Sequence, residues 1–116
     1  MISRKARKFG RMSGVRRSFL KGLMHNLIME EKIKTTEARA KEIKPRVEKL
    51  VTAAKRNNVA SLRILIQRLP HKSSAMKLFN EIAPRYAKRR GGYLRIVKTA
   101  RVRKRDAAPQ AIIEFV

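Results

Sequence analysis

The sequence has 116 residues, which suits one domain with a modest hydrophobic core. Its 31 Lys and Arg residues against 8 Asp and Glu give a formal net charge of +23, although 43% of the residues are hydrophobic, as in folded proteins. Because like charges at this density repel one another, we expect a folded domain with a polyanionic partner, and nucleic acid fits better than an anionic membrane. The absence of cysteine excludes disulfides and thiolate metal sites, and no apolar run approaches the length of a membrane span.

Residues 1–12 are a basic stretch that contains no acidic residue. Apart from Phe9, this stretch has no side chain that would anchor it in a core. We therefore predict a flexible basic arm at residues 1–12, followed by a single domain at residues 13–116. A solubilising tail is one alternative for the arm, and an organelle transit peptide, which is also rich in arginine and free of acids, is another.

The first predicted helix begins at Ser13, which is a suitable N-cap. Apolar residues recur at steps of one and three, as expected for one helical face. This stripe consists of Phe19, Leu20, Leu23, Met24, Leu27 and Ile28. Arg16, Arg17 and Lys21 lie off the stripe and extend the basic surface of the arm.

Residues 33–36 predict a short strand that leads into a long helix with Thr36 as its N-cap. Glu37 then suits the positive end of the helix dipole. The apolar face of this helix consists of Ile43, Val47, Leu50, Val51 and Ala54. Pro45 lacks a backbone N–H, so we expect a kink or a restart of the helix there. The strand between these two helices argues against a DNA-reading helix-turn-helix, which requires a short turn.

Two shorter helices are predicted next. The first is capped by Asn58 and stopped by Pro70. Its predicted inward face consists of Val59, Leu62, Leu65, Ile66 and Leu69. The second begins at residue 73 or 74 and is closed by Pro84. Its predicted inward side chains are Met76, Phe79 and Ile82.

After a turn at residues 91–92, residues 93–99 and 110–116 alternate as two β-strands. In the first of them, Leu94 and Ile96 share one face. The other face carries Tyr93, Arg95 and Val97. The two strands would pair as a hairpin with a charged loop, and residues 33–36 would add a third strand. The sequence therefore predicts an α+β fold of two layers, with about four helices packed on a small two- or three-stranded sheet.

Two basic clusters, from Arg4 to Lys21 and from Arg85 to Arg105, are the candidate binding sites, and neither contains an acid. Each phosphate that they neutralise releases condensed counterions, so we expect an affinity that falls steeply with salt. Duplex RNA hides its base edges in a deep groove. The cations would therefore contact the phosphate backbone and recognise its shape rather than the base sequence. The predicted RNA-binding residues are Arg4, Lys5, Arg7, Lys8, Arg11, Arg16, Arg17, Lys21, Arg85, Lys88, Arg89, Arg90, Arg95, Arg101, Arg103, Lys104 and Arg105.

Other side chains that could stack on bases, catalyse a reaction or bind a metal have simpler explanations. Phe9, Tyr86 and Tyr93 would stack on splayed bases, but each tyrosine is explained equally well as a core residue. His25 and His71 are lone histidines without a nucleophile or an acid at motif spacing. No glycine-rich phosphate loop is present, and adjacent glutamates at residues 30 and 31 diverge on a helix. We therefore predict no enzyme, and no catalytic residue, metal ligand, cofactor or small-molecule substrate.

Three stretches carry a resemblance to a known family. The longest is Ile33-x-Thr35-Thr36, Arg39-Ala40-Lys41 and then Glu48-x-Leu50-Val51-Thr52-x-Ala54-Lys55. The other two are Asn80-Glu81-Ile82-Ala83-Pro84-Arg85-Tyr86-Ala87 and Gly91-Gly92-Tyr93-x-Arg95-Ile96-x-Lys98. Together they resemble the bacterial-type large-subunit ribosomal protein seventeen family.

The resemblance implies a structural role in the large ribosomal subunit. It implies that the protein binds and stabilises folded ribosomal RNA near the peptide-exit side, beside neighbouring large-subunit ribosomal proteins. It also implies a cytoplasmic protein, in the ribosome, although an organellar ribosome is the alternative. We expect no membrane association and no homo-oligomer. Charge by itself separates RNA from DNA poorly, so an architectural DNA-binding protein stays open as the second interpretation.

Overall fold

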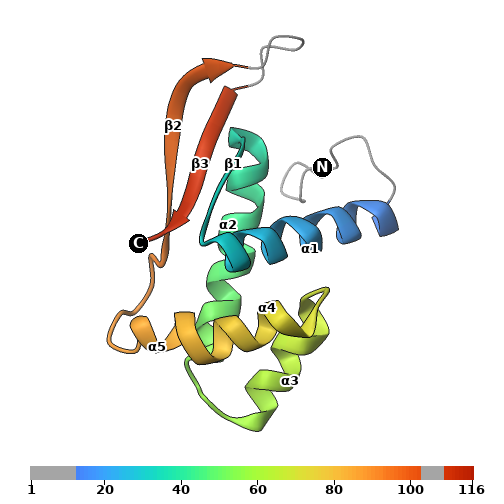
Figure 1. Ribbon diagram of the computed structural model, residues 1–116, viewed down its shortest axis with the longest axis vertical. Helices are drawn as coiled ribbons and strands as arrows, with labels where there is room; N and C mark the ends of the chain where they lie inside the picture. Colours follow the sequence, from blue (N-terminus) through green and yellow to red (C-terminus); the bar gives the residue numbers. More distant parts are fainter. Residues whose placement is uncertain (1–12, 103–108) are drawn as a thin grey trace, which may run out of the picture.

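The computed structural model describes residues 13–102 and 109–116, so the predicted arm at residues 1–12 lies outside the described residues. The helices are α1 (Ser13–Glu30), α2 (Glu37–Ala54), α3 (Val59–Arg68) and a fourth segment of α4 (Lys72–Lys77), η1 (Leu78–Ile82) and α5 (Ala83–Arg85). The strands are β1 (Lys32–Thr36), β2 (Leu94–Val102) and β3 (Pro109–Phe115) (Figure 1). Helices packed on a small sheet confirm the predicted α+β class. Within the described part of the chain, no helix is long and apolar enough to cross a membrane.

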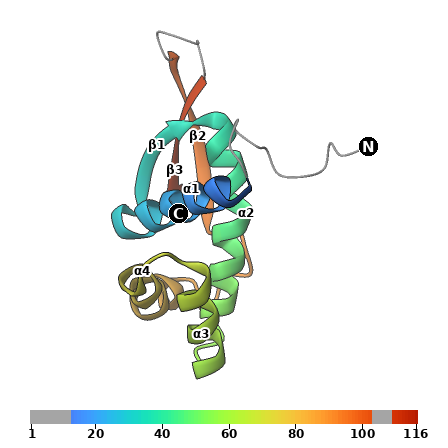
Figure 2. The ribbon, with the colours of Figure 1, turned by 90° about the vertical axis from the view of Figure 1, so that its right-hand side faces the viewer.

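The sheet has three antiparallel strands in the order β1-β3-β2, so the segment at residues 33–36 does add the third strand. β3 is central, and its side chains alternate between a buried face and a half-buried one. Ala111, Ile113 and Phe115 form the buried face, against which α2 packs (Figure 2). Residues that oppose one another in register point to the same side. The register therefore places Lys32, Glu114 and Arg95 in one row on the outer face.

α2 contacts the sheet, α1, α3 and the fourth helical segment, and it begins where the sequence predicts. The hydroxyl of Thr36 accepts a hydrogen bond from the backbone N–H of Arg39 at 3.3 Å. The helix then runs without interruption through Pro45, so a restart there is wrong. Proline removes one backbone hydrogen bond. Ile43 and Val47, which flank Pro45 on the inward face, are fully buried and hold the helix against the core.

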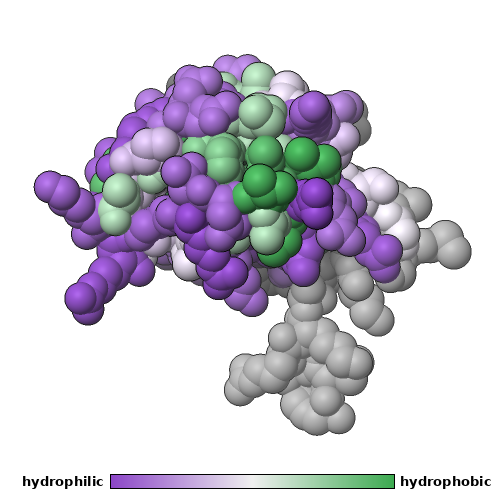
Figure 3. All heavy atoms as spheres, turned by 90° about the horizontal axis from the view of Figure 1, so that it is seen from below, coloured by the Kyte–Doolittle hydropathy of each residue, from purple (hydrophilic) through white to green (hydrophobic). Residues whose placement is uncertain are grey.

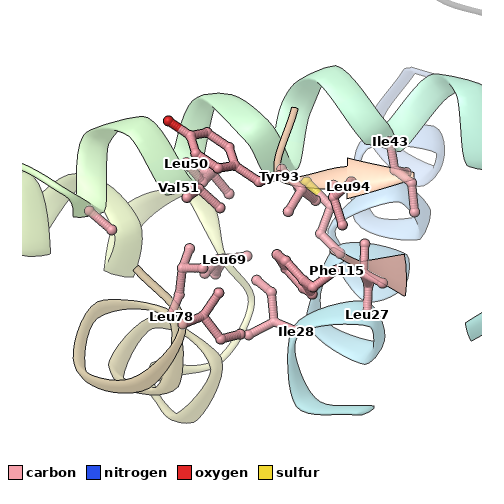
Figure 4. Packing of buried hydrophobic residues seen from close by; sticks show 14 of the residues in the cluster. Leu27, Ile28, Ile43, Leu50, Val51, Leu69, Leu78, Tyr93, Leu94 and Phe115 are labelled. Carbon is pink, nitrogen blue, oxygen red and sulfur yellow. The ribbon is translucent and has the colours of Figure 1, made fainter. Parts of the chain in front are cut away.

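The core lies between α2, α1, the fourth helical segment and the sheet (Figure 4). Leu27 and Ile28 of α1 and Leu78 of η1 are completely buried within it. Each such side chain stabilises the fold by roughly 1.5–3 kcal/mol relative to exposure. Tyr93 is also in the core, with 1% exposure, although the alternation pattern placed it with Arg95 on the face opposite Leu94. Because β2 begins only at Leu94, Tyr93 precedes the strand and does not follow its alternation.

The covered face of α3 is narrower than predicted. Val59 is 65% exposed and Ile66 is 38% exposed, whereas Leu65 is fully buried and Leu69 nearly so. Only a narrow edge of α3 is covered by α2 and α4, and that edge also carries buried Ser61. The wider apolar stripe therefore extends onto the surface. Figure 3, which views the molecule from the α3 end, shows apolar side chains among hydrophilic ones.

The fourth helical segment continues past the residue that was predicted to close it. The backbone N–H of Ala83 donates to the carbonyl of Leu78, which is the wide hydrogen bond of a π-helical turn. Pro84 then lies at the start of α5, where its missing N–H is not needed. The π-helical turn thus lets the chain remain helical as far as Arg85.

Candidate nucleic-acid interface

Glu31 joins the fourth helical segment to the α1–β1 connection. Its carboxylate lies 2.7 Å from Nη1 of Arg85 and 3.3 Å from Nζ of Lys77. Lys77 also donates to the carbonyl of Met29 at 2.7 Å. The hydrogen bond from Arg85 holds the pKa of the Glu31 carboxyl below its ordinary value, and the same bond raises the pKa of Arg85. Arg85, a predicted RNA-binding residue, is therefore exposed but engaged in an intramolecular ion pair, and its role toward RNA stays a prediction.

On the outer face of the sheet, Arg95 is a second predicted RNA-binding residue that forms an ion pair within the protein. Nε of Arg95 lies 3.5 Å from Oε1 of Glu114, while Lys32 opposes Glu114 on the other side. The Arg95 side chain is 60% exposed, so solvent screens this pair and it stabilises little. The fold therefore depends little on this pair, and the role of Arg95 toward RNA stays a prediction.

The connection between α5 and β2 contains the middle of the second basic cluster, and it begins and ends near two anchored tyrosines. Tyr86 donates to the carbonyl of Val116 at 2.7 Å, and its ring centroid is 5.3 Å from that of Tyr93. Both rings are buried, so they are core residues and do not stack on bases. Burial raises the pKa of Tyr86, while a hydrogen bond from Lys55 lowers the pKa of Tyr93.

Between these two anchored tyrosines the chain exposes Lys88, Arg89 and Arg90. None of the ion pairs within residues 13–102 and 109–116 involves any of the three. Nε of Arg89 donates to the carbonyl of Gly91, and the Arg89 carbonyl accepts from Nζ of Lys55. These two hydrogen bonds hold the backbone of the segment at Arg89 and Gly91, while all three cationic side chains remain exposed.

Several predicted contact residues have no described side chain. In the first cluster, Arg17 is exposed and Lys21 is half-buried on α1. The side chains of Arg16 and Arg101 are not described, although both residues lie in regular elements. The predicted residues outside the described ranges are Arg4, Lys5, Arg7, Lys8, Arg11, Arg103, Lys104 and Arg105. Phe9 lies there too.

The structure adds a basic site that sequence reasoning missed. Residues of α1, α2 and α3 line an open groove with a volume of about 730 Å³. Its apolar lining includes Leu20, Met24, Leu50, Ala53 and Ile64. Its cations are Arg17, Lys21, Arg46, Lys49 and Arg68. The first two of these cations were predicted, but the other three belong to segments that only tertiary packing brings to the same groove.

The described carboxylates mostly tie the fold together. Glu37 lies 3.2 Å from Nζ of Lys41 and 3.7 Å from Nζ of Lys98, which links α2 to β2. A side-chain oxygen of Glu48 accepts from the backbone N–H of Leu94 at 3.3 Å. Because carboxylates are so few in the sequence and several of them bond inward, the described surface keeps a large excess of cations.

Comparison with known families decides the identity. The profile described as ribosomal protein L17 matches residues 19–116, which is most of the chain. This chain belongs to the ribosomal protein L17 family.

Curated members of the family agree along nearly the full length. The large ribosomal subunit protein bL17 of Thermodesulfovibrio yellowstonii is 47% identical over 110 residues, which cover 95% of this chain and 82% of the relative. The protein of the same name from Enterococcus faecalis is 44% identical, with 95% of this chain and 97% of the relative covered. That of Sphingopyxis alaskensis is 49% identical, with 95% and 78% covered.

L17 family proteins are structural, non-enzymatic components of the ribosome, so the predicted absence of enzymatic activity is confirmed by the family. The fold does bring the two histidines together, which the sequence did not indicate. The ring centroids of His25 and His71 are 4.7 Å apart in an edge-on arrangement. Among the described residues, no group of three or more potential ligand side chains surrounds them or any other point.

Proposed function

We propose that this L17 family protein is a constituent of the large ribosomal subunit that binds and stabilises folded ribosomal RNA through its two basic clusters, near the peptide-exit side. One observation supports this most directly. The connection between Tyr86 and Tyr93 is fixed by buried rings, yet it presents Lys88, Arg89 and Arg90 without carboxylate partners in the described structure. Cations that are held in place before binding lose less conformational freedom when they meet phosphates.

The chemistry is phosphate neutralisation rather than base reading. Arginine forms forked contacts with phosphate, and lysine supplies a mobile point charge. Arg95 can join the same surface because its pair with Glu114 is solvent-exposed. On a folded RNA, such contacts recognise the course of the backbone and reduce repulsion between neighbouring strands.

Neighbouring large-subunit ribosomal proteins are the second class of partner in this proposal. The exposed apolar residues Val59 and Ile66 on α3 are suited to such a contact, since exposed apolar patches mark interaction sites. Self-association is disfavoured because two chains of formal charge +23 repel each other. In this proposal the protein resides in the cytoplasm, in the ribosome.

Competition binding at two salt concentrations tests the proposal. Labelled large-subunit ribosomal RNA is bound by the purified protein and competed with unlabelled RNA or with duplex DNA of equal nucleotide content. We expect the RNA to compete better at both salts and the affinity to fall linearly in a double-logarithmic salt plot. Equal competition by duplex DNA would favour the architectural DNA-binding interpretation, and affinity that is insensitive to salt would contradict both. Co-sedimentation with ribosomal subunits at rising salt tests the subunit assignment directly.

A further inference from the structure

The groove between α1, α2 and α3 combines a cationic rim with an apolar floor, and phosphate binding alone does not require the apolar floor. We propose that this groove receives the base of an unpaired RNA nucleotide, while the flanking phosphates lie on the rim. This inference rests on the proposed RNA-binding function and deepens it. It names a second kind of contact in which a base, and not only the backbone, is held.

The rim supplies the phosphate contacts. Arg17 and Lys21 lie one turn apart on α1, and Arg46 and Lys49 lie one turn apart on α2. Arg68 at the end of α3 completes the rim. Among the described residues that line the groove, Glu42 is the acidic one, and its carboxylate is 3.4 Å from the guanidinium of Arg46. The pair of cations on α1 and the pair on α2 can therefore each contact successive phosphates of a single strand.

The floor supplies the base contact. Leu20, Met24 and Leu50 are nearly buried, yet they line the groove, and Ile64 at its α3 side is 37% exposed. The volume of about 730 Å³ lies in the range of ligand-sized clefts, which is roughly 300–1,000 Å³. Bases in a duplex are stacked and paired, so they cannot enter such a groove, whereas an unpaired base can be splayed out. Its faces would contact the apolar floor, and guanidinium planes at the rim offer further stacking.

Charge excludes the nearest competing occupants. The sequence of residues 1–12 has five Lys and Arg and no acid, so it is repelled by a cationic rim. A second copy of the chain is repelled for the same reason. An acidic amphipathic helix is the remaining competitor, because such helices also fit apolar grooves between helices. The observations favour RNA because Arg17 and Lys21 continue the first basic cluster into the groove.

Methyl NMR of the intact chain tests the occupant. The Met24 and Ile64 methyl groups report on the floor, and the Met29 and Ile112 methyl groups, which are outside the groove lining, serve as references. The probes are a short oligouridylate, an abasic oligoribonucleotide of the same length and an acidic amphipathic peptide. We expect the oligouridylate to shift the two floor methyl groups while the reference methyl groups stay in place. The abasic strand should leave the floor methyl groups unshifted, because it carries phosphates without bases.

Paired variants provide a second readout. Lys49→Ala with Arg68→Ala removes two rim cations, and Arg56→Ala with Arg63→Ala removes two cations that do not line the groove. We expect the rim variant to lose about tenfold in oligouridylate affinity because it loses phosphate contacts, and the control variant to lose clearly less. All four positions are outside the buried core, so both variants should fold, and circular dichroism checks this.

The outcomes separate the two proposals. If the parent protein binds neither ribosomal RNA nor oligouridylate, the proposed function itself fails. If it binds ribosomal RNA but both strands move the floor methyl groups equally, or neither does, the groove inference is overturned and the function stands. If the acidic peptide displaces oligouridylate from the floor at equal salt, the groove belongs to a protein partner and the inference is likewise overturned.

Discussion

Nη1 of Arg85 lies 2.7 Å from Oε1 of Glu31, and this pair fastens the end of the fourth helical segment to the residue between α1 and β1. Glu31 has a backbone φ of 65°, a left-handed conformation that is unusual for a residue other than glycine. The carboxylate therefore serves a local turn and a long-range connection at once. A cation from a cluster that the sequence assigned to RNA is thus also part of the framework.

Replacement of Glu31 by glutamine should destabilise the protein by about 1 kcal/mol at neutral pH, since charged hydrogen bonds to Lys77 and Arg85 are weakened but remain partly solvent-screened. Because the folded-state pKa of Glu31 lies below the ordinary 4.5, its contribution is present above that value and is lost as pH falls through the lower folded-state pKa. Urea denaturation of the parent and the variant, from neutral pH down through the folded-state pKa of Glu31, measures this difference in unfolding free energy. A stability difference that persists undiminished in acid would contradict the role of the carboxylate charge.

The α3 orientation is tested by two neighbouring substitutions. Leu65→Ala should cost about 2–5 kcal/mol because it leaves a cavity at a fully buried site. Ile66→Ala, at a site that is 38% exposed, should cost less than about 1 kcal/mol. Thermal unfolding of the two variants compares them directly. Equal losses would indicate that the wider apolar stripe of α3 is covered after all.

The two tyrosines should matter for stability and not for RNA affinity. Tyr93→Phe removes the 3.0 Å hydrogen bond with Lys55 and should cost about 1 kcal/mol of unfolding free energy. Tyr86→Phe removes the hydrogen bond to Val116 and should behave similarly. Filter binding to ribosomal RNA should be unchanged in both. The phenylalanine variants keep an aromatic ring, so Tyr93→Leu is the control, and a loss of RNA affinity there without unfolding would indicate stacking.

Removal of two exposed cations should weaken RNA binding without loss of stability. In the Lys88→Ala, Arg90→Ala variant we expect the slope of log affinity against log salt to fall by about 0.7–0.9 for each lost phosphate contact. The melting temperature should stay within the error of the parent value, because both side chains are exposed. A matched variant, Lys72→Ala with Arg63→Ala, removes the same charge elsewhere on the surface. Identical slopes for the two variants would show that only net charge matters.

Charge reversal in the hairpin tests the remainder of the second cluster. We expect Arg101→Glu with Arg103→Glu and Arg105→Glu to weaken RNA binding because repulsion replaces phosphate attraction. Circular dichroism and thermal melting should show an intact domain. Affinity equal to that of the parent would remove the hairpin from the RNA-binding surface.

The sequence by itself determined the succession of helices and strands, the strand character of the segment at residues 33–36, and the excess of cations. These properties are local or compositional, since helical and strand periods, caps and charge counts need no knowledge of neighbours. The three stretches of family resemblance were likewise visible in the chain. They led to the family that the comparison confirmed.

Only the tertiary structure decided which face of each element is covered. Periodicity shows that α3 has an apolar face, but α2 and α4 cover only its Leu65 edge and leave Ile66 in solvent. Tyr93 is buried because the chain enters the core before β2 starts. Arg46 and Arg68 line one groove because α2 and α3 pack against each other, and the sequence pattern of neither helix contains this contact.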